Sequence, residues 1–145
     1  MTLAERKSRY VLAGQVASRH AGGVTAKVNS LLRPHKHKCH TVTFDNGKEF
    51  SEHETIAAKL KADIYFAHPC HSWERGLNEN SNGLLRQYFP KSMRLADVTE
   101  EQVQWTVDRL NHRSRKVLGF RTPHEVCFGV SVSYTRPPLV VVLRI

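Results

Sequence analysis

The alternation of apolar and polar side chains is clearest between His40 and Phe44, where threonines separate the inward-facing positions. A period of two residues is typical of a strand with one buried face. Asn46-Gly47 ends the pattern, because this pair favours a turn. The sequence therefore predicts a strand from His40 to Phe44 with Asp45 at its exit.

Other apolar stretches predict further strands. The run Tyr10–Val16 is typical of a buried strand, and strand-compatible positions within Met1–Lys7 would pair with it, antiparallel, through a turn at residues 6–8. Another short strand is predicted at Asp63–His68. A helix separates it from the strand that ends at Phe44, so these two strands should be parallel and joined by a right-handed crossover.

Apolar residues at helical spacing predict a helix over residues 21–32, which Pro34 stops. A second helix is predicted after Ser51, because Ser51 and Glu54 have the spacing of a capping box. The inner faces of these two helices consist of Ala21, Val24, Val28, Leu31 and Leu32 in the first and Ile56, Ala57 and Leu60 in the second.

Two more helices are predicted in the second half of the chain. One carries Glu79 in its first turn and continues through Tyr88 toward Pro90. The other starts at a second capping box, from Thr99 to Gln102. Its apolar stripe consists of Val103, Val107 and Leu110, and its cationic far end of Arg109, His112, Arg113, Arg115 and Lys116. Strands and helices in this order predict an α/β domain.

Composition limits the classes of function. The 145 residues suffice for one domain with a substantial core. Lys and Arg number 22 against 13 Asp and Glu, and the net charge of +9 indicates a polyanionic partner, nucleic acid ahead of membrane. There is no apolar signal core or membrane-length apolar run, and three irregularly spaced cysteines indicate neither a disulfide framework nor a paired zinc motif. We therefore expect a soluble cytoplasmic protein without a membrane partner.

Two carboxylates are candidate metal ligands. Asp45 leaves a strand and Glu79 lies in a helix, with 33 residues between them, so both can meet at one edge of a sheet. Mg²⁺ prefers such oxygen ligands, and two Mg²⁺ ions can clamp the attacking and leaving oxygens of a phosphodiester. Simpler interpretations remain open at this point, namely a strand-ending turn at Asp45 and a favourable helix-terminus charge at Glu79.

The segments around these carboxylates, TFDNGKEF and HSWERGLNENSNGLLRQYFPK, resemble the two signature segments of the IS-thirty family of insertion-sequence transposases. These are DDE transposases similar to retroviral integrases, and the resemblance covers roughly residues 2–128. It implies an RNase H-like fold, a mixed sheet flanked by helices with the integrase catalytic core. It also implies metal-dependent cleavage and transfer of DNA strands in transposition of an insertion sequence.

The same resemblance assigns roles to individual residues. Asp45 and Glu79 would be catalytic and would bind Mg²⁺ or Mn²⁺, with two ions expected only for a complete site. Arg86 lies seven residues after Glu79, so a continuous helix would put both on one face; a solvated helix charge is the alternative. Contacts to DNA are expected from Lys48, Arg75, Asn78, Asn82 and Arg86.

The resemblance begins inside the family's second strand, so the family's first strand and first catalytic Asp would lie upstream of Met1. We expect residues 1–128 to be a partial catalytic core and residues 129–145 a divergent tail. Such a fragment would be inactive alone, because phosphoryl transfer depends on charge and positioning that a missing carboxylate weakens. Its expected partners are transposon-end and target DNA, a second copy of the chain, or an intact transposase.

Three alternatives remain. A non-catalytic remnant would bind DNA through phosphates or pair with an intact transposase. A basic structural protein associated with RNA would leave both signature segments unexplained. The cluster His35, His37, Cys39 and His40 suggests zinc, but the interleaved lysines favour a basic loop before a strand.

Overall fold

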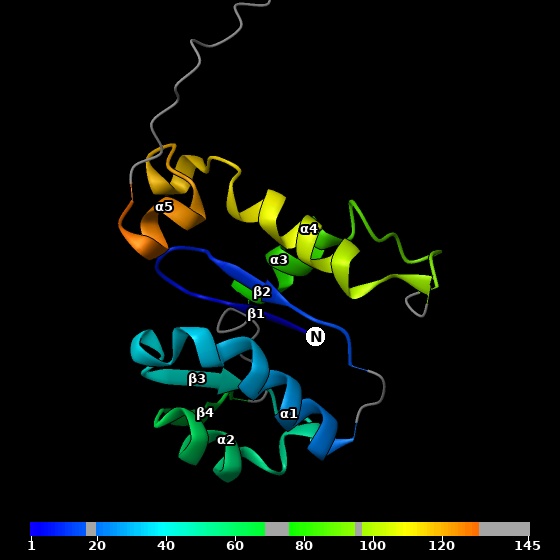
Figure 1. Ribbon diagram of the computed structural model, residues 1–145, viewed down its shortest axis with the longest axis vertical. Helices are drawn as coiled ribbons and strands as arrows, with labels where there is room; N and C mark the ends of the chain where they lie inside the picture. The colour runs from blue at the N-terminus through cyan, green and yellow to red at the C-terminus, as the bar shows by residue number, and fades with distance from the viewer. Residues whose placement is uncertain (17–19, 69–75, 95–96, 131–145) are drawn as a thin grey trace, which may run out of the picture.

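The computed structural model describes residues 1–16, 20–68, 76–94 and 97–130, in which short strands alternate with helices (Figure 1). This α/β arrangement agrees with the sequence prediction. The elements are β1 (Thr2–Ala4), β2 (Val11–Ala13), α1 (Ala21–Leu32), η1 (Arg33–Lys38), β3 (Thr41–Phe44), η2 (Lys48–Phe50), α2 (His53–Leu60), β4 (Asp63–Phe66), α3 (Gly76–Leu85), α4 (Glu100–Asn111), η5 (Lys116–Leu118) and α5 (Pro123–Phe128). No helix among the described residues is long and apolar enough to cross a membrane.

The strands form two small sheets. β1 and β2 are antiparallel, with Thr2 opposite Ala13, and β3 and β4 are parallel, with Thr41 opposite Asp63. Both pairings confirm the sequence prediction, although the strands are shorter than predicted. Figure 1 shows the strands in the order β2, β1, β3 and β4, and within the described residues β1 and β3 are not hydrogen-bonded to each other.

The buried apolar side chains divide into two clusters, one for each sheet. The β3 cluster joins the β3–β4 sheet to α1 and α2 and consists of Val24, Val28, Val42, Phe44, Ile56, Leu60 and Ala62. The β2 cluster joins β2 to α3 and α4 and consists of Ala13, Leu85, Val98, Val103, Val107 and Leu110. Met1 and Val16 pack against the β3 cluster, so the two halves of the molecule adjoin at the start of β1.

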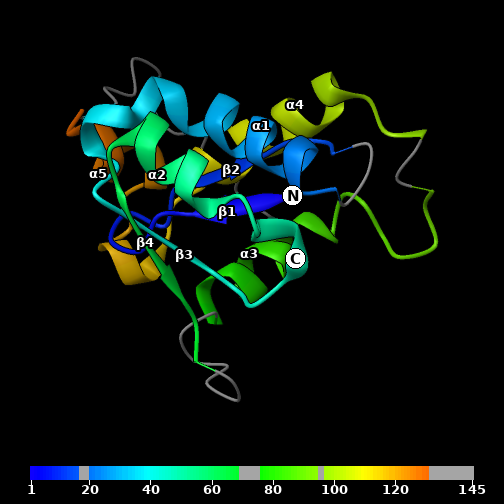
Figure 2. The same ribbon diagram turned by 90° about the horizontal axis from the view of Figure 1, so that it is seen from below.

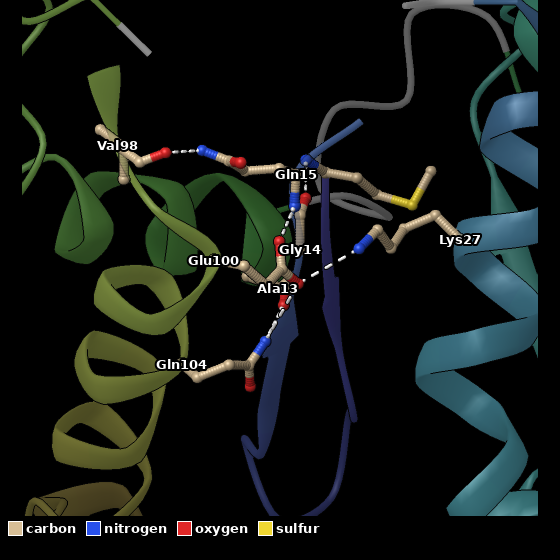
Figure 3. A network of polar contacts seen from close by, with 8 residues as sticks. Ala13, Gly14, Gln15, Lys27, Val98, Glu100 and Gln104 are labelled. Atoms are coloured by element: carbon tan, nitrogen blue, oxygen red, sulfur yellow. Dashed lines mark hydrogen bonds and ion pairs between the residues drawn. The ribbon is translucent and has the colours of Figure 1, made fainter. Parts of the chain in front are cut away.

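Helix α4 covers the outer edge of β2 with polar side chains. The buried Asn111 accepts a hydrogen bond of 2.8 Å from the Val11 N–H and donates one of 2.8 Å to the Val11 C=O. Gln104 donates a hydrogen bond of 2.9 Å to the C=O of Ala13 (Figure 3). These bonds satisfy backbone groups that would otherwise be open to pairing with another strand.

Glu100, at the start of α4, connects this edge with α1 (Figure 3). Its carboxylate accepts a hydrogen bond of 3.0 Å from the Gln15 N–H and forms an ion pair of 3.2 Å with Lys27 of α1. The Gln15 side chain also donates to the C=O of Val98. The hydrogen bond from Gln15 is the largest reason that the pKa of Glu100 is below its usual value; burial opposes it, and Lys27 lowers it further.

Of the two capping boxes that the sequence predicts, the structure confirms one and contradicts the other. Thr99 accepts a hydrogen bond from the Gln102 N–H, and the Gln102 side chain accepts one from Thr99, so the predicted capping box of α4 is confirmed. The box predicted at Ser51 is wrong, because α2 begins after Glu52 and no side chain caps it. Ser51 ends η2 with helical angles of φ −59° and ψ −25°, whereas an N-cap residue needs an extended backbone.

Helix α5 begins with a capping box of its own, in which Thr122 and Glu125 exchange hydrogen bonds. It packs on the turn side of the β1–β2 pair and on η1 through four rings, each of which has its centroid within 6.4 Å of the centroids of at least two others. The rings belong to Tyr10, His35, His124 and Phe128. Helix α5 thus fastens the end of the predicted core region to its first hairpin.

Candidate active site

Asp45 follows β3 directly, as the sequence predicted. Asp45 as a whole is half-buried, and the Oδ1 atom of its side chain is shielded from solvent. The next residue, Asn46, donates a side-chain hydrogen bond of 2.9 Å to the C=O of Ala67, just beyond β4. This bond ties the turn after β3 to the end of the neighbouring strand, so Asp45 lies at the carboxyl end of the parallel pair.

The turn after Asp45 folds back onto the strand that it leaves. Phe50 stacks on Phe44 with ring centroids 4.3 Å apart and ring planes 14° from parallel. Gly47 lies beside the Glu49 carboxylate, an oxygen of which would be 2.5 Å from a Cβ at this position. A side chain there would force Glu49 to turn away. Lys48, a predicted DNA contact, is exposed at the start of η2.

Glu79 lies in the first turn of α3, as predicted, and is exposed. The helix is fixed by its neighbours Asn78 and Asn82, whose side-chain oxygens lie 3.2 and 2.6 Å from the Thr2 hydroxyl of β1. Sequence reasoning assigned these asparagines to DNA and missed their contact within the protein. No local signal could have found it, because Thr2 is 76 and 80 residues away along the chain.

Of the two arginines predicted to contact DNA, the structure places Arg86 but does not describe Arg75. Arg86 is exposed but lies beyond the end of α3 at Leu85, so the prediction of one continuous helix through Tyr88 is wrong. Past Leu85 the backbone tightens into turns, with hydrogen bonds from the Gln87 N–H to the Leu84 C=O and from the Tyr88 N–H to the Leu85 C=O. Tyr88 and Phe89 still pack against the β2 cluster. Arg75 lies outside the described residues.

The two candidate carboxylates belong to different halves of the molecule. Asp45 ends the β3–β4 sheet, whereas Glu79 is on a helix that packs against β1 and the β2 cluster. In the part of the chain that the structure describes, no three or more His, Cys, Asp or Glu side chains are grouped so that they could hold a metal ion. Carboxylate oxygens fit Mg²⁺, which keeps several waters and is commonly held by one or two carboxylates.

An exposed aromatic side chain on α4 was not singled out from the sequence. Trp105 is 56% exposed, the Arg109 guanidinium lies 4.7 Å from its ring centroid, and Tyr88 meets it edge-on at 6.2 Å. Spacing of four residues between Trp105 and Arg109 is the signal that could have found the pair. Stacked Trp and Arg side chains offer a face to a nucleobase or to another protein.

The fold and the site define an α/β protein with a net charge of +9, one carboxylate at a strand end and another on a helix. No protein-family model matches the chain. It is 46% identical over 125 residues to the transposase for insertion sequence element IS4351 of Bacteroides fragilis, covering 86% of this chain and 38% of that protein.

Two further relatives agree. The transposase InsI for insertion sequence element IS30A of Escherichia coli K12 is 36% identical over 126 residues, which is 86% of this chain and 33% of the relative. The transposase for IS1086 of Cupriavidus metallidurans is 38% identical over 137 residues, 92% of this chain and 40% of the relative. The chain belongs to the IS30-type insertion-sequence transposases, which confirms the resemblance, and it spans less than half the length of these relatives.

Proposed function

We propose that the chain is the catalytic-core segment of a DNA transposase with an RNase H-like fold. The observation that carries the proposal is 46% identity over 125 residues to a protein named as a transposase. The parallel β3–β4 pair, with a carboxylate at its exit and a helix between its strands, is compatible with that fold. The chemistry would be cleavage of DNA and joining of the freed strand to a target.

Asp45 and Glu79 would hold divalent metal ions in this reaction. Their oxygen donors suit Mg²⁺ or Mn²⁺, and the bound ions would supply charge to the attacking and leaving oxygens of a phosphodiester. The protein's part is to fix the carboxylates. Asn46 and the stacked Phe50 hold the turn that carries Asp45, and Thr2 holds the helix that carries Glu79.

The resemblance to DDE transposases implies a third carboxylate beside Asp45 and Glu79, and we propose that a complete site needs it. Among the described residues, no three metal-binding side chains are grouped. Phosphoryl transfer depends mainly on positioning and electrostatic stabilisation, and a two-carboxylate site supplies less of both. The chain alone is therefore proposed to bind metal weakly and to be inactive in strand transfer.

A titration with Mn²⁺ tests the metal site. We expect Asp45→Asn and Glu79→Gln each to weaken Mn²⁺ binding by about tenfold or more, measured from the signal of free Mn²⁺ by electron paramagnetic resonance. Glu101→Gln, which removes an exposed carboxylate from α4, is the matched control and should leave the titration unchanged. Identical titrations for the wild type and all three variants would contradict the proposal.

A second candidate function is DNA binding without catalysis, possible because the net charge is +9 and both Lys48 and Arg86 are exposed. Fluorescence anisotropy with a labelled duplex would show affinity that falls steeply with salt. Arg86→Ala should weaken binding more than Lys59→Ala, which removes an exposed cation from α2. Affinity that is the same with and without Mg²⁺, and unchanged by Asp45→Asn, would favour this function over the first.

A further inference from the structure

The loop between α4 and α5, residues 113–121, carries an aromatic side chain in an unfavourable backbone conformation. We call it the Phe120 loop. Phe120 has a φ of 64°, in the left-handed region, directly after Gly119 with a φ of 63°. Bulky residues rarely adopt this conformation, whereas glycine adopts it freely. Strain of this kind is often found at functional sites, so a ring at this position indicates a role that glycine could not supply.

Hydrogen bonds close the Phe120 loop and hold its shape. The Arg115 N–H donates to the Arg121 C=O at 3.0 Å, and the Phe120 N–H donates to the Arg115 C=O at 3.0 Å. The half-buried Arg115 side chain also anchors the loop to α4, because its guanidinium donates a hydrogen bond of 3.4 Å to the Leu110 C=O. The Phe120 ring is therefore presented on a preorganised loop.

The ring itself is open to solvent. Phe120 is 72% exposed and Val117 of the same loop is 67% exposed, the two highest values among the exposed large apolar residues that the structure describes. In the described part of the chain, Phe120 makes no contact with another ring or with a cation. Most of the ring surface is thus available to a ligand.

The Phe120 loop contains cations and no carboxylate. Arg113, Lys116 and Arg121 are exposed, and no Asp or Glu occurs from residue 112 to residue 124. Among the described residues, none of these three cations forms an ion pair. Burial lowers the pKa of Arg115 below its usual value, and repulsion by Arg113 lowers it further. An anionic ligand would relieve this concentration of positive charge.

The exposed ring of Trp105 on α4 has different surroundings. The Arg109 guanidinium already lies over it, and Tyr88 meets it edge-on. Glu101 and Asp108 lie one turn away on either side along the helix and are exposed, so their carboxylates would repel phosphates. Of these two exposed aromatic side chains, only Phe120 combines an open ring with neighbouring cations alone, which is the combination that suits a nucleic acid.

We propose that the Phe120 loop binds an unpaired segment of nucleic acid. The Phe120 ring stacks on a nucleobase, and Arg113, Lys116 and Arg121 contact the phosphates on either side of that base. Stacking needs an open base face, which neighbouring base pairs cover in a duplex, so the ligand is single-stranded. Because every base has such a face, binding tolerates different sequences.

This contact is separate from the candidate carboxylates. Helix α5, which follows the loop, packs on η1 before the start of β3, and Lys38 of η1 donates a hydrogen bond of 2.9 Å to the Cys127 C=O. Asp45 follows the opposite end of β3. Figures 1 and 2 both show α5 and the loop before it away from that end of the strand. The metal chemistry proposed for Asp45 and Glu79 is not needed for this inference.

Fluorescence anisotropy with a labelled oligothymidylate of about a dozen nucleotides, without divalent metal, tests this inference. Phe120→Leu keeps an apolar side chain but removes the ring and should weaken binding by about fivefold or more. Phe120→Tyr restores a ring and should bind like the wild type. Tyr65→Leu, which removes a ring that is 55% exposed on β4, is the matched control and should also bind like the wild type.

A strand of the same length with abasic sugars is the matched control on the ligand side. It offers the same phosphates without bases, so the wild type and Phe120→Leu should bind it equally. Lys116→Ala should weaken binding of both strands and reduce the dependence of affinity on salt, because it removes a phosphate contact. A duplex of the same length should bind the wild type and Phe120→Leu equally.

Thermal unfolding separates a binding role of Phe120 from a structural one. Phe120→Gly relieves the unfavourable φ and should raise the melting temperature while it weakens binding of oligothymidylate. A lower melting temperature for Phe120→Gly would overturn the inference, because the ring would then stabilise the fold.

Three binding results would also overturn the inference. The first is equal affinity of the wild type and Phe120→Leu for oligothymidylate. The second is an equal loss of affinity by Phe120→Leu for the abasic strand or the duplex, because unpaired bases would then not be the ligand. The third is a loss confined to an acidic polyglutamate peptide, which would make the partner a protein. None of these results affects the Mn²⁺ titration, and the proposed function is therefore tested independently.

Discussion

The Asn111 side chain bonds to the N–H and C=O groups of Val11, which a neighbouring strand would otherwise bond. We expect Asn111→Leu to lower the free energy of unfolding by about 2–4 kcal/mol, because it leaves two buried backbone groups without partners. Gln104→Ala removes a more exposed bond to the same strand and should cost about 1 kcal/mol or less. Urea unfolding followed by circular dichroism measures both. Small and equal losses of unfolding free energy in the two variants would mean that water replaces the Asn111 side chain as the partner of Val11.

The asparagines near Glu79 show that the sequence can indicate that a residue makes contacts without indicating its partner. Three asparagines in one helix are unfavourable for helix propensity and indicate a role in contacts, and Asn78 and Asn82 do make contacts. Their partner, Thr2, is set by how α3 packs on β1, and nothing in the local sequence encodes that packing. Their role toward DNA stays a prediction. The contacts with Thr2 use the side-chain oxygens, so the amide NH₂ groups would be the donors to a phosphate.

At the scale of elements, the starts of α4 and α2 allow a paired test of which residues cap the helices. Thr99→Ala removes the capping box of α4 and should destabilise the protein by about 1 kcal/mol. Ser51→Ala, at the position where the sequence wrongly predicted a cap, should change stability by less than about 0.5 kcal/mol, because Ser51 caps no helix. Thermal unfolding of both variants at one pH measures the difference. A larger loss for Ser51→Ala than for Thr99→Ala would contradict the assigned helix starts.

Elements with a strong local pattern were predicted well, and elements shaped by distant contacts were not. The alternation around Val42 predicted β3 and the position of Asp45, and the stripe that includes Leu110 predicted α4. The end of α3 was missed because Tyr88 and Phe89 keep helical spacing with Leu85, so the sequence pattern does not mark the point where the backbone tightens into turns. Both strand pairings were predicted, because each joins strands that follow one another along the chain.

The link between α1 and α4 through Glu100 should depend on pH. The folded-state pKa of Glu100 is below its usual value of 4.5, so its stabilising effect is fully present above that pH and is lost as pH falls through the folded-state pKa. We expect Glu100→Gln to lower the melting temperature at about pH 7 and the difference from wild type to shrink toward about pH 3. Glu101→Gln is the control, since its side chain is exposed. A difference that is constant across this range would contradict the role of the charge.

At the scale of the whole molecule, the division of the core matters more than any one contact. Few described interactions cross from the β3 cluster to the β2 cluster, and the Lys27–Glu100 ion pair is one of them. Its side chains are 25% and 43% exposed, so it contributes modestly. The candidate carboxylates are divided in the same way, with Asp45 in one half and Glu79 in the other. Precise placement of the two thus requires that the halves be held together firmly.

We therefore predict that the two halves open separately. Ile56 and Leu110 are both fully buried, one in each cluster, and replacement of either by Ala should cost about 2–5 kcal/mol locally. Ile56→Ala should speed amide exchange in β3 and α2 more than in α4, and Leu110→Ala should do the reverse, because regions with separate cores open as separate units. Native-state hydrogen exchange by mass spectrometry resolves these segments. If each variant accelerates exchange equally in β3 and α4, the halves form one cooperative unit, and the two clusters are then a single core in energetic terms.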